Sequence, residues 1–131
     1  AGAASTFSVV DGQLEVDVTN VGTDNWNVQL FQEGATMTQG AVYTVTFDAM
    51  SSVDRDINVK IIDGNNAEFT ANFTLTDTMT TFTYTFVYTG TSDTAKIDFE
   101  LGAGTNGITT GVASLITFDD VLFYRNFNPQ D

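Results

Sequence analysis

Apolar and polar residues alternate one by one through most of this chain, and this alternation constrains the fold more than any other feature. Successive side chains of a β-strand point to opposite faces, so a strand with one buried face has a hydrophobic period of two. No stretch shows the period of an amphipathic helix. The clearest alternating runs are residues 14–18, 43–49, 57–62, 69–75, 82–88, 95–101 and 115–124.

Turn-forming residues separate these runs and set the spacing of the strands. Gly, Asn and Asp mark the breaks because they tolerate or stabilise turn conformations. The breaks fall at residues 11–12, 20–22, 33–34, 39–40, 63–66, 89–90 and 102–107. This spacing predicts an all-β fold, a two-sheet antiparallel β-sandwich or jelly roll of about 8–10 strands. We expect one such domain over residues 1–124, followed by a C-terminal tail or linker start at 125–131.

One side of each predicted strand supplies the core, and the other side faces water or a ligand. The predicted core residues are Tyr43, Val45, Phe47, Ala49, Phe82, Tyr84, Phe86, Tyr88, Ala95, Ile97, Phe99 and Leu101.

The composition excludes several kinds of chemistry. The chain has no Cys and no His, so disulfides, thiolate metal sites and Ser-His-Asp or Cys-His catalysis are absent. Seventeen acidic residues against four basic ones give a net charge of −13. Such a surface repels nucleic acids and anionic membranes, so we expect neither as a partner. The acidity is compatible with a neutral polymer, with calcium, or with a role in solubility alone.

The single tryptophan, Trp26, is the first candidate for ligand binding. An indole suits stacking on the face of a sugar ring. In a strand, however, Trp26 would share a side with Val28 and Leu30, so it could equally be a buried anchor. Gln29 has the opposite parity and points to the polar side, where its amide could both donate to and accept from sugar hydroxyls. It could also be an ordinary solvated strand residue.

The order Trp26-x-Val-Gln-Leu30, then Gly40-x-x-Tyr-x-Val-x-Phe-Asp-Ala49, resembles carbohydrate-binding modules of families four, nine, sixteen and twenty-two. The resemblance covers roughly residues 8–123 and implies a galactose-binding-like β-sandwich without catalytic activity. It implies that Trp26 stacks on the ligand, that Gln29 and Asp98 hydrogen-bond to it, and that Phe69 is a further stacking candidate. It also implies a structural calcium ion at Asp119, although the family's opening Gly-x-Phe-Glu segment is not visible here.

Three further polar residues lie on or near one predicted strand. Asn58 and Lys60 share a face opposite Ile57, Val59 and Ile61, so they could line a groove. Arg55, at the start of this strand, could donate a pair of hydrogen bonds to neighbouring hydroxyls or to the acid group of a sugar. The alternative for Arg55 is a surface salt bridge with Asp54 or Asp56.

Asp98 and Glu100 are alternate residues on one strand face, about 7 Å apart, which is a spacing that a glycosidase could use. A general acid needs burial to raise its pKa, and this pair is predicted to sit on an exposed polar face. We therefore predict no enzymatic activity.

These features predict a secreted, extracellular module that binds single chains of a β-linked polysaccharide in a groove. The module is expected to be monomeric and to be tethered to a polysaccharide-degrading enzyme. The alternative is a structural or adhesive β-sandwich domain of a secreted or cell-surface protein with no sugar site. An exposed Trp26 ringed by polar groups would favour the first function. A Trp26 buried against Phe47 and Phe99 would favour the second.

Overall fold

The computed structural model describes residues 2–103 and 112–126, and within them the chain forms nine β-strands and one short 3₁₀ helix. The strands are β1 (Ala4–Val10), β2 (Gln13–Asn20), β3 (Gln29–Thr36), β4 (Val42–Ser51), β5 (Arg55–Asp63), β6 (Glu68–Leu75), β7 (Thr80–Val87), β8 (Thr94–Glu100) and β9 (Ser114–Arg125), and the 3₁₀ helix is η1 (Asn25–Asn27). None of the described helical residues forms a segment that could cross a bilayer.

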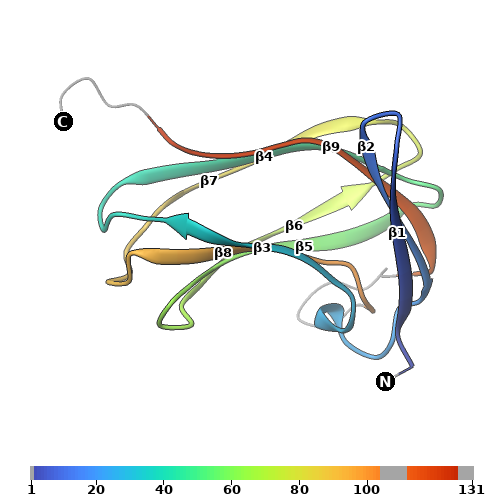
Figure 1. The fold of residues 1–131 in the computed structure, drawn as a ribbon, viewed down its shortest axis with the longest axis horizontal. Helices are drawn as coiled ribbons and strands as arrows, with labels where there is room; N and C mark the ends of the chain where they lie inside the picture. Colours follow the sequence, from blue (N-terminus) through green and yellow to red (C-terminus); the bar gives the residue numbers. More distant parts are fainter. Residues whose placement is uncertain (1, 104–111, 127–131) are drawn as a thin grey trace.

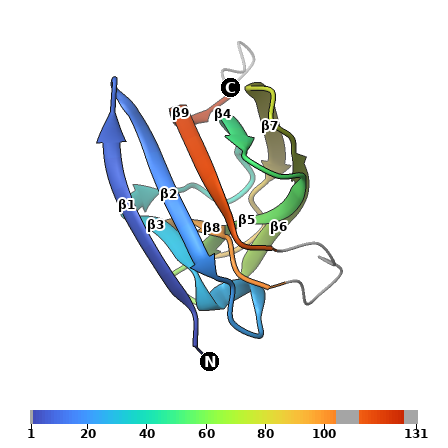
Figure 2. The ribbon, with the colours of Figure 1, turned by 90° about the vertical axis from the view of Figure 1, so that its right-hand side faces the viewer.

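The strands make two antiparallel sheets that pack face to face (Figures 1 and 2). The five-stranded sheet has the order β1-β2-β9-β4-β7, and the four-stranded sheet has the order β3-β8-β5-β6. This arrangement confirms the predicted all-β, two-sheet antiparallel sandwich. The predicted C-terminal tail begins inside β9, which ends at Arg125, and residues 127–131 lie outside the described part of the chain.

Aromatic rings fill the space between the sheets. Phe47 of β4 lies at the centre of the cluster, within ring-centroid distances of 5.1 Å of Phe99 and 5.5 Å of Phe73. Phe118 of β9 packs on Phe99 at 5.2 Å. Edge-to-face and offset arrangements of this kind add to the gain from burying the apolar area. The predicted core side of β4 is confirmed, because Tyr43, Val45, Phe47 and Ala49 are all buried.

The sandwich is open along one side, and this opening leaves part of the predicted core only half-buried. β2 pairs with β9 only as far as Phe118, so the second half of β9 has a free edge that lies near β3. A cavity of about 610 Å³ lies there, and Tyr43, Ile97 and Phe123 line it together with residues of β3. Ile97 is half-buried because no strand covers it on this side.

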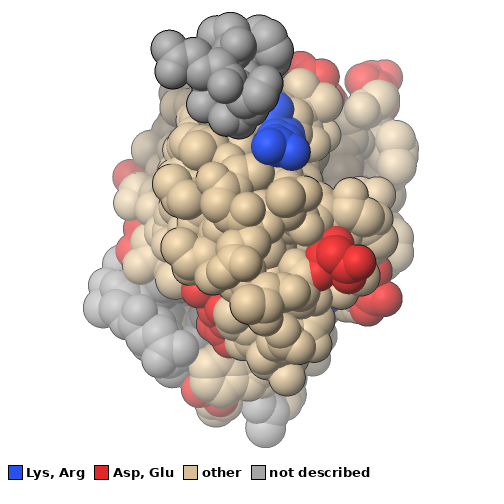
Figure 3. Space-filling model, turned by 90° about the vertical axis from the view of Figure 1, so that its left-hand side faces the viewer, with Lys and Arg blue, Asp and Glu red and all other residues tan. Residues whose placement is uncertain are grey.

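Charge is not spread evenly over the molecule. The end of the sandwich that carries the β3–β4 and β7–β8 connections is mostly uncharged, with acidic side chains scattered around it (Figure 3).

Candidate functional site

The outer face of the four-stranded sheet carries the predicted polar residues in register. We call this surface the polar face. Its first row across the strands is Gln29, Glu100, Asn58 and Asn72, and its second row is Phe31, Asp98, Lys60 and Thr70. The third row is Glu33, Lys96, Ile62 and Glu68. Side chains that are directly opposite on neighbouring strands lie close enough to interact, so each row acts as one strip of surface.

Along the polar face, buried and half-buried side chains of the two central strands lie between exposed side chains of the two edge strands, and we call this central strip the trough. Asp98, Glu100 and Asn58 point away from the core and are nevertheless buried. The flanking residues on β3 and β6, such as Gln29 and Thr70, are exposed. Two hollows lie on this face. One, of about 420 Å³, lies between Asn58, Lys60 and strand β6. The other, of about 310 Å³, lies between Glu33, Lys96 and the turn after β5.

A network of charges forms the floor of this trough. The Lys60 Nζ atom lies 3.1 Å from Glu100 Oε1 and 3.2 Å from Glu68 Oε1. Burial lowers the pKa of Lys60. The hydrogen bonds and negative charges of Glu100 and Glu68 outweigh this effect, so the pKa of Lys60 is raised above its ordinary value. Lys60 therefore stays charged and holds β5, β6 and β8 together on this face.

Asp98 lies next to this network and is fully buried, with no exposed surface. Neither of its carboxylate oxygens has a hydrogen-bond partner among the described residues. The pKa of Asp98 is raised to about 7. Burial is the largest cause and the neighbouring Glu100 carboxyl group is the next, while the positive charges of Lys96 and Lys60 oppose the shift. Our premise that Asp98 and Glu100 sit exposed on the sheet was wrong. Asp98 is instead buried out of reach of a ligand, so it does not make the ligand hydrogen bond that the resemblance implies, and the raised pKa does not make it a usable general acid.

This burial predicts a distinctive dependence of stability on pH. The folded-state pKa of Asp98 lies above its ordinary value of 3.8. Its contribution to stability is therefore fully present below about pH 4 and is lost as the pH rises through about 7. We expect Asp98→Asn to remove a loss on the order of 4 kcal/mol and to make the protein more stable than wild type at pH 8. Urea unfolding at pH 5, 6.5 and 8 measures this. Asp77→Asn, at an exposed position, is the control, and parallel pH curves for Asp98→Asn and wild type would refute the assignment.

Asn58 contributes the second unusual group of the trough. Its Nδ2 atom donates to Thr70 Oγ1 at 2.8 Å and to Asn72 Oδ1 at 2.6 Å. Its Oδ1 atom is buried and accepts no hydrogen bond from the described residues. Asn58 and Lys60 thus lie where the alternation predicts, and the Asn58 amide joins β5 to Thr70 and Asn72 of β6.

Trp26 lies in the loop that leads into β3, next to the first row of the polar face. The side chain of Asn27 accepts hydrogen bonds from the backbone N–H groups of Thr23 and Asp24, both at 2.9 Å. Gly22 has φ +72°, and a Cβ there would lie 2.6 Å from Asn27 Oδ1, so only glycine fits. These contacts fold residues 25–27 into η1, and β3 begins only at Gln29.

Trp26 therefore does not follow strand parity, and its side chain is 44% exposed. Phe47 and Phe99 pack on each other and on other phenylalanines of the core. The alternative of Trp26 as a fully buried anchor is thus wrong. Gln29 is exposed, as predicted, and its Nε2 atom donates to Trp26 O at 2.9 Å, which ties the first row of the face to the Trp26 loop.

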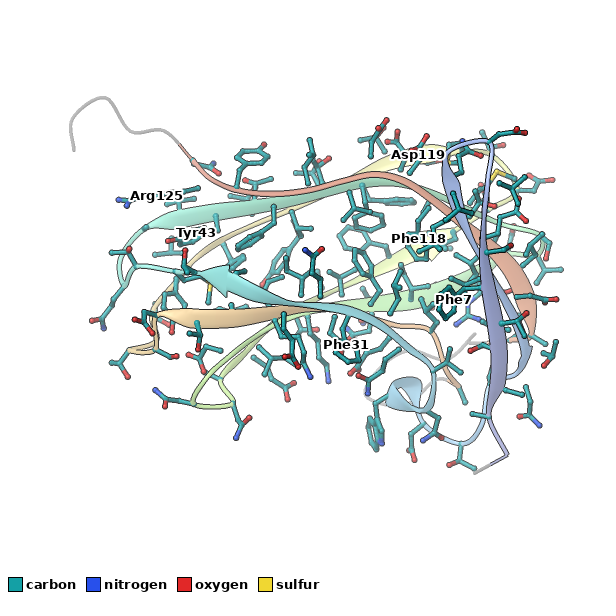
Figure 4. All side chains as sticks on the ribbon, viewed as in Figure 1. Phe7, Phe31, Tyr43, Phe118, Asp119 and Arg125 are labelled. Atoms are coloured by element: carbon teal, nitrogen blue, oxygen red, sulfur yellow. The ribbon has the colours of Figure 1, made fainter. Side chains whose placement is uncertain are left out.

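Phe31 is an aromatic residue of the face that the sequence reasoning missed. It pairs with Asp98 across β3 and β8, is 52% exposed, and has Lys96 Nζ 5.0 Å from its ring centroid. Figure 4 labels Phe31 on β3. The sequence does contain the signal for this position, because Phe31 has the same strand parity as Gln29 and must therefore point to the same polar side. Phe31 belongs to the second row of the polar face and Lys96 to the third, and their side chains contact each other across these two rows.

Arg55 does not belong to the polar face, and both interpretations of it were wrong. Its side chain has no exposed surface, so it neither lines a groove nor makes a surface salt bridge. Its guanidinium donates to Leu101 O at 2.5 Å and to Val112 O at 2.6 Å, on the two sides of the β8–β9 connection. Burial, partly opposed by Asp56, lowers the pKa of Arg55 to about 10, so the group is still a cation at neutral pH.

Phe69 is also misplaced by the sequence analysis. It lies on the inner side of β6, where its ring stacks on Phe86 at 5.1 Å and contacts Tyr88 edge-on at 5.5 Å. Alternation along β6 sends Thr70 and Asn72 outward and Phe69 and Phe73 inward. Phe69 is therefore part of the core and not a stacking platform for a ligand.

Asp119, the predicted calcium ligand, lies on β9 opposite Asp48 of β4. Its carboxylate accepts hydrogen bonds from Gln13 Nε2 at 3.3 Å and from the backbone N–H of Asp120 at 2.9 Å. No three acidic side chains come together as a metal site within the described residues. Calcium at Asp119 stays a prediction of the resemblance. Thermal melts in calcium and in chelator test it: the described donors predict equal melting temperatures, whereas the resemblance predicts a higher one with calcium.

Comparisons with known proteins agree with this geometry. The sequence model of the family described as "Carbohydrate binding domain" (CBM_4_9) matches residues 1–109. A solved structure described as "CBM4 structure and function" is 32% identical, with a TM-score of 0.83, and the match covers 96% of this chain and 79% of that one.

The N-terminal cellulose-binding domain of β-1,4-glucanase C from Cellulomonas fimi is 21% identical with a TM-score of 0.72. That match covers 93% of this chain and 84% of that one, and shows the shared fold alone. No curated protein sequence matches the chain. The family match spans most of the chain, including the Trp26 loop and the strands of the polar face. The chain therefore belongs to the CBM_4_9 family of carbohydrate-binding domains.

Proposed function

We propose that this domain binds single chains of a β-linked polysaccharide along the trough of the polar face. Two exposed aromatic residues carry the proposal: Phe31 lies in the second row of the polar face, and Trp26 lies in the loop that leads into its first row. Aromatic rings provide stacking surfaces for the C–H faces of sugar rings. Exposed amide and hydroxyl groups beside them, on Gln29, Thr70 and Asn72, can exchange hydrogen bonds with sugar hydroxyls.

The charges of the trough favour a neutral polysaccharide over an acidic one. The face carries Glu100, Glu68 and Glu33, together with Asp98 once it ionises at about pH 7, against two lysines. Lys60 is already paired with Glu100 and Glu68, and Lys96 lies over the Phe31 ring. A polyanion such as alginate would add negative charge to a chain whose net charge is already −13. A neutral glucan, xylan or mannan would not incur this repulsion.

The proposal also covers where the domain acts and what kind of protein it is attached to. A similar fold occurs in a cellulose-binding domain of a β-1,4-glucanase. By this likeness, the domain is secreted and keeps an appended polysaccharide-degrading enzyme near its substrate. A few stacking and hydrogen-bonding contacts give a modest affinity, with a dissociation constant of about 10–100 μM. The structural or adhesive alternative depended on a buried Trp26, and the exposed Trp26 does not favour it.

Native affinity electrophoresis of the whole chain tests this function. The gels contain β-1,3-glucan, mixed-linkage glucan, xylan, glucomannan, alginate or agarose. We expect retardation by at least one neutral β-linked polymer and none by alginate. Unchanged mobility in all of them, with a folded protein, would contradict the proposed function. Retardation by alginate alone would contradict the charge argument.

A further inference from the structure

Asp98, in the second row of the polar face, lies in surroundings that suit a protonated carboxyl group. It points to the outer side of β8, yet it has no exposed surface, and no described residue donates a hydrogen bond to it. The Glu100 carboxyl group lies within hydrogen-bonding reach. Two carboxyl groups that face each other can form a hydrogen bond only when one of them keeps its proton.

Lys60 decides which of the two groups carries this proton. Its Nζ atom lies 3.1 Å from Glu100 Oε1, so Glu100 is held as a carboxylate and Asp98 is the group that donates. The other charged side chains that face this pair from the described strands are Lys96 of β8, Glu33 of β3 and Glu68 of β6. The positive charges of Lys60 and Lys96 favour ionised Asp98. Lys60, however, is already paired, and the Lys96 Nζ atom lies over the ring of Phe31.

Asp98 can change its charge close to neutral pH, and the composition of the chain makes this change easy to recognise. Burial and the neighbouring Glu100 raise the pKa of Asp98 to about 7. The chain has no His and no Cys, the side chains whose ordinary pKa values lie closest to neutrality. A change in the binding properties of the polar face between about pH 5.5 and 8.5 would therefore report on Asp98.

Ionised Asp98 cannot keep its place in the closed face. Its neighbours along β8, Ile97 and Phe99, point into the core, so water can reach a new charge only from the outer side. On that side its neighbours in register are Phe31 and Lys60. To solvate the charge, these two side chains must move apart, or Asp98 must turn outward between them. Either movement rearranges the surface on which a sugar ring would stack.

We infer that polysaccharide binding at the polar face is coupled to a proton on Asp98, so that the face binds its ligand with Asp98 protonated and loses affinity when Asp98 ionises. This inference rests on the proposed function. A ligand that lies over Phe31 covers the side from which water would solvate Asp98, so it binds more weakly to the ionised form. By linkage, the bound sugar also makes the proton harder to remove.

Affinity electrophoresis of the whole chain at about pH 5.5 and 8.5 tests the coupling. The gels contain the neutral polymer that retards the wild type, among β-1,3-glucan, mixed-linkage glucan, xylan and glucomannan. At pH 8.5 about 3% of Asp98 keeps its proton, which sets an upper limit of about 30-fold on the loss of affinity. We expect the dissociation constant of the wild type to rise at least about tenfold between the two pH values.

Two variants separate Asp98 from other effects of pH. The Asn side chain in Asp98→Asn stays uncharged and can donate to Glu100, as the protonated carboxyl group does. We expect this variant to bind with the same dissociation constant at both pH values. Asp77→Asn, at an exposed position outside the polar face, is expected to keep the pH dependence of the wild type. Circular dichroism checks that each protein is folded at both pH values.

The coupling also predicts the reciprocal effect of sugar on the proton. Carbon-13 NMR follows the Asp98 carboxyl group of the wild type with and without oligosaccharides of the same polymer. We expect saturation with the oligosaccharide to raise the midpoint of the Asp98 titration by at least about one pH unit. A midpoint that does not move would contradict the coupling.

The outcomes distinguish this inference from the proposed function. Wild-type binding that is equal at the two pH values or stronger at pH 8.5 would overturn the coupling and leave the proposed function standing. The same pH dependence in Asp98→Asn as in the wild type would do so too. A folded wild type that none of the four neutral polymers retards at either pH would overturn both.

Discussion

Replacing Arg55 by Met is expected to lower the free energy of unfolding by about 3–5 kcal/mol. The methionine keeps most of the volume but leaves Leu101 O and Val112 O without their buried donor. Unpaired buried carbonyl groups cost about 1–3 kcal/mol each, and hydrogen bonds from charged donors are the stronger kind. Since domains of this size are stable by only about 5–15 kcal/mol, this one change removes a large part of the total.

Chemical denaturation measures the effect, and Arg125→Met is the matched control. Arg125 is exposed at the end of β9, and its replacement is expected to change stability by less than about 0.5 kcal/mol. Arg55→Lys keeps the positive charge with fewer donors in a different geometry, so it is expected to fall between wild type and Arg55→Met. A loss of under 1 kcal/mol for Arg55→Met would contradict the view that Arg55 fastens the two sides of the β8–β9 connection.

The alternation of residues predicts the fold well because strand parity is a local property. Whether Tyr43 or Thr44 faces the core follows from the run of β4 alone, and the structure agrees for the inward side of that strand. The same rule places Asn58 and Lys60 outward on β5 and makes Phe31 outward on β3. The sequence thus predicts the composition of the polar face even though it does not show which strands are neighbours.

The errors arise where a side chain's environment depends on distant parts of the chain. Arg55 lies between two aspartates in sequence, which is typical of the surface, yet its partners come from residues 101 and 112. Asp98 is buried because its neighbours in register are Phe31 and Lys60, a pairing that only the sheet order reveals. Trp26 departs from strand parity because Asn27 caps a turn there, so turn chemistry overrides the hydrophobic pattern.

Replacing Trp26 by Ala is expected to weaken polysaccharide binding strongly without unfolding the protein. Truncating an aromatic stacking contact costs about 2 kcal/mol or more, which corresponds to a roughly 30-fold weaker affinity. From about 10–100 μM, the dissociation constant would rise into the millimolar range. Because the Trp26 side chain is 44% exposed and lies in a loop, we expect the melting temperature to change little. Phe31→Ala is expected to weaken binding by a smaller factor, since its ring is also shared with Lys96.

The most direct test of the proposal that the polar face binds the sugar is isothermal titration calorimetry with oligosaccharides of a neutral polymer that retards the wild type. The variants are Trp26→Ala, Phe31→Ala and, as the matched control, Tyr124→Ala. Tyr124 is equally exposed, at 47%, but lies on the five-stranded sheet. We predict that both substitutions at the polar face weaken binding, Trp26→Ala most strongly, while Tyr124→Ala binds like wild type. Binding that survives Trp26→Ala and Phe31→Ala but is lost in Tyr124→Ala would place the sugar on the other sheet and contradict the account.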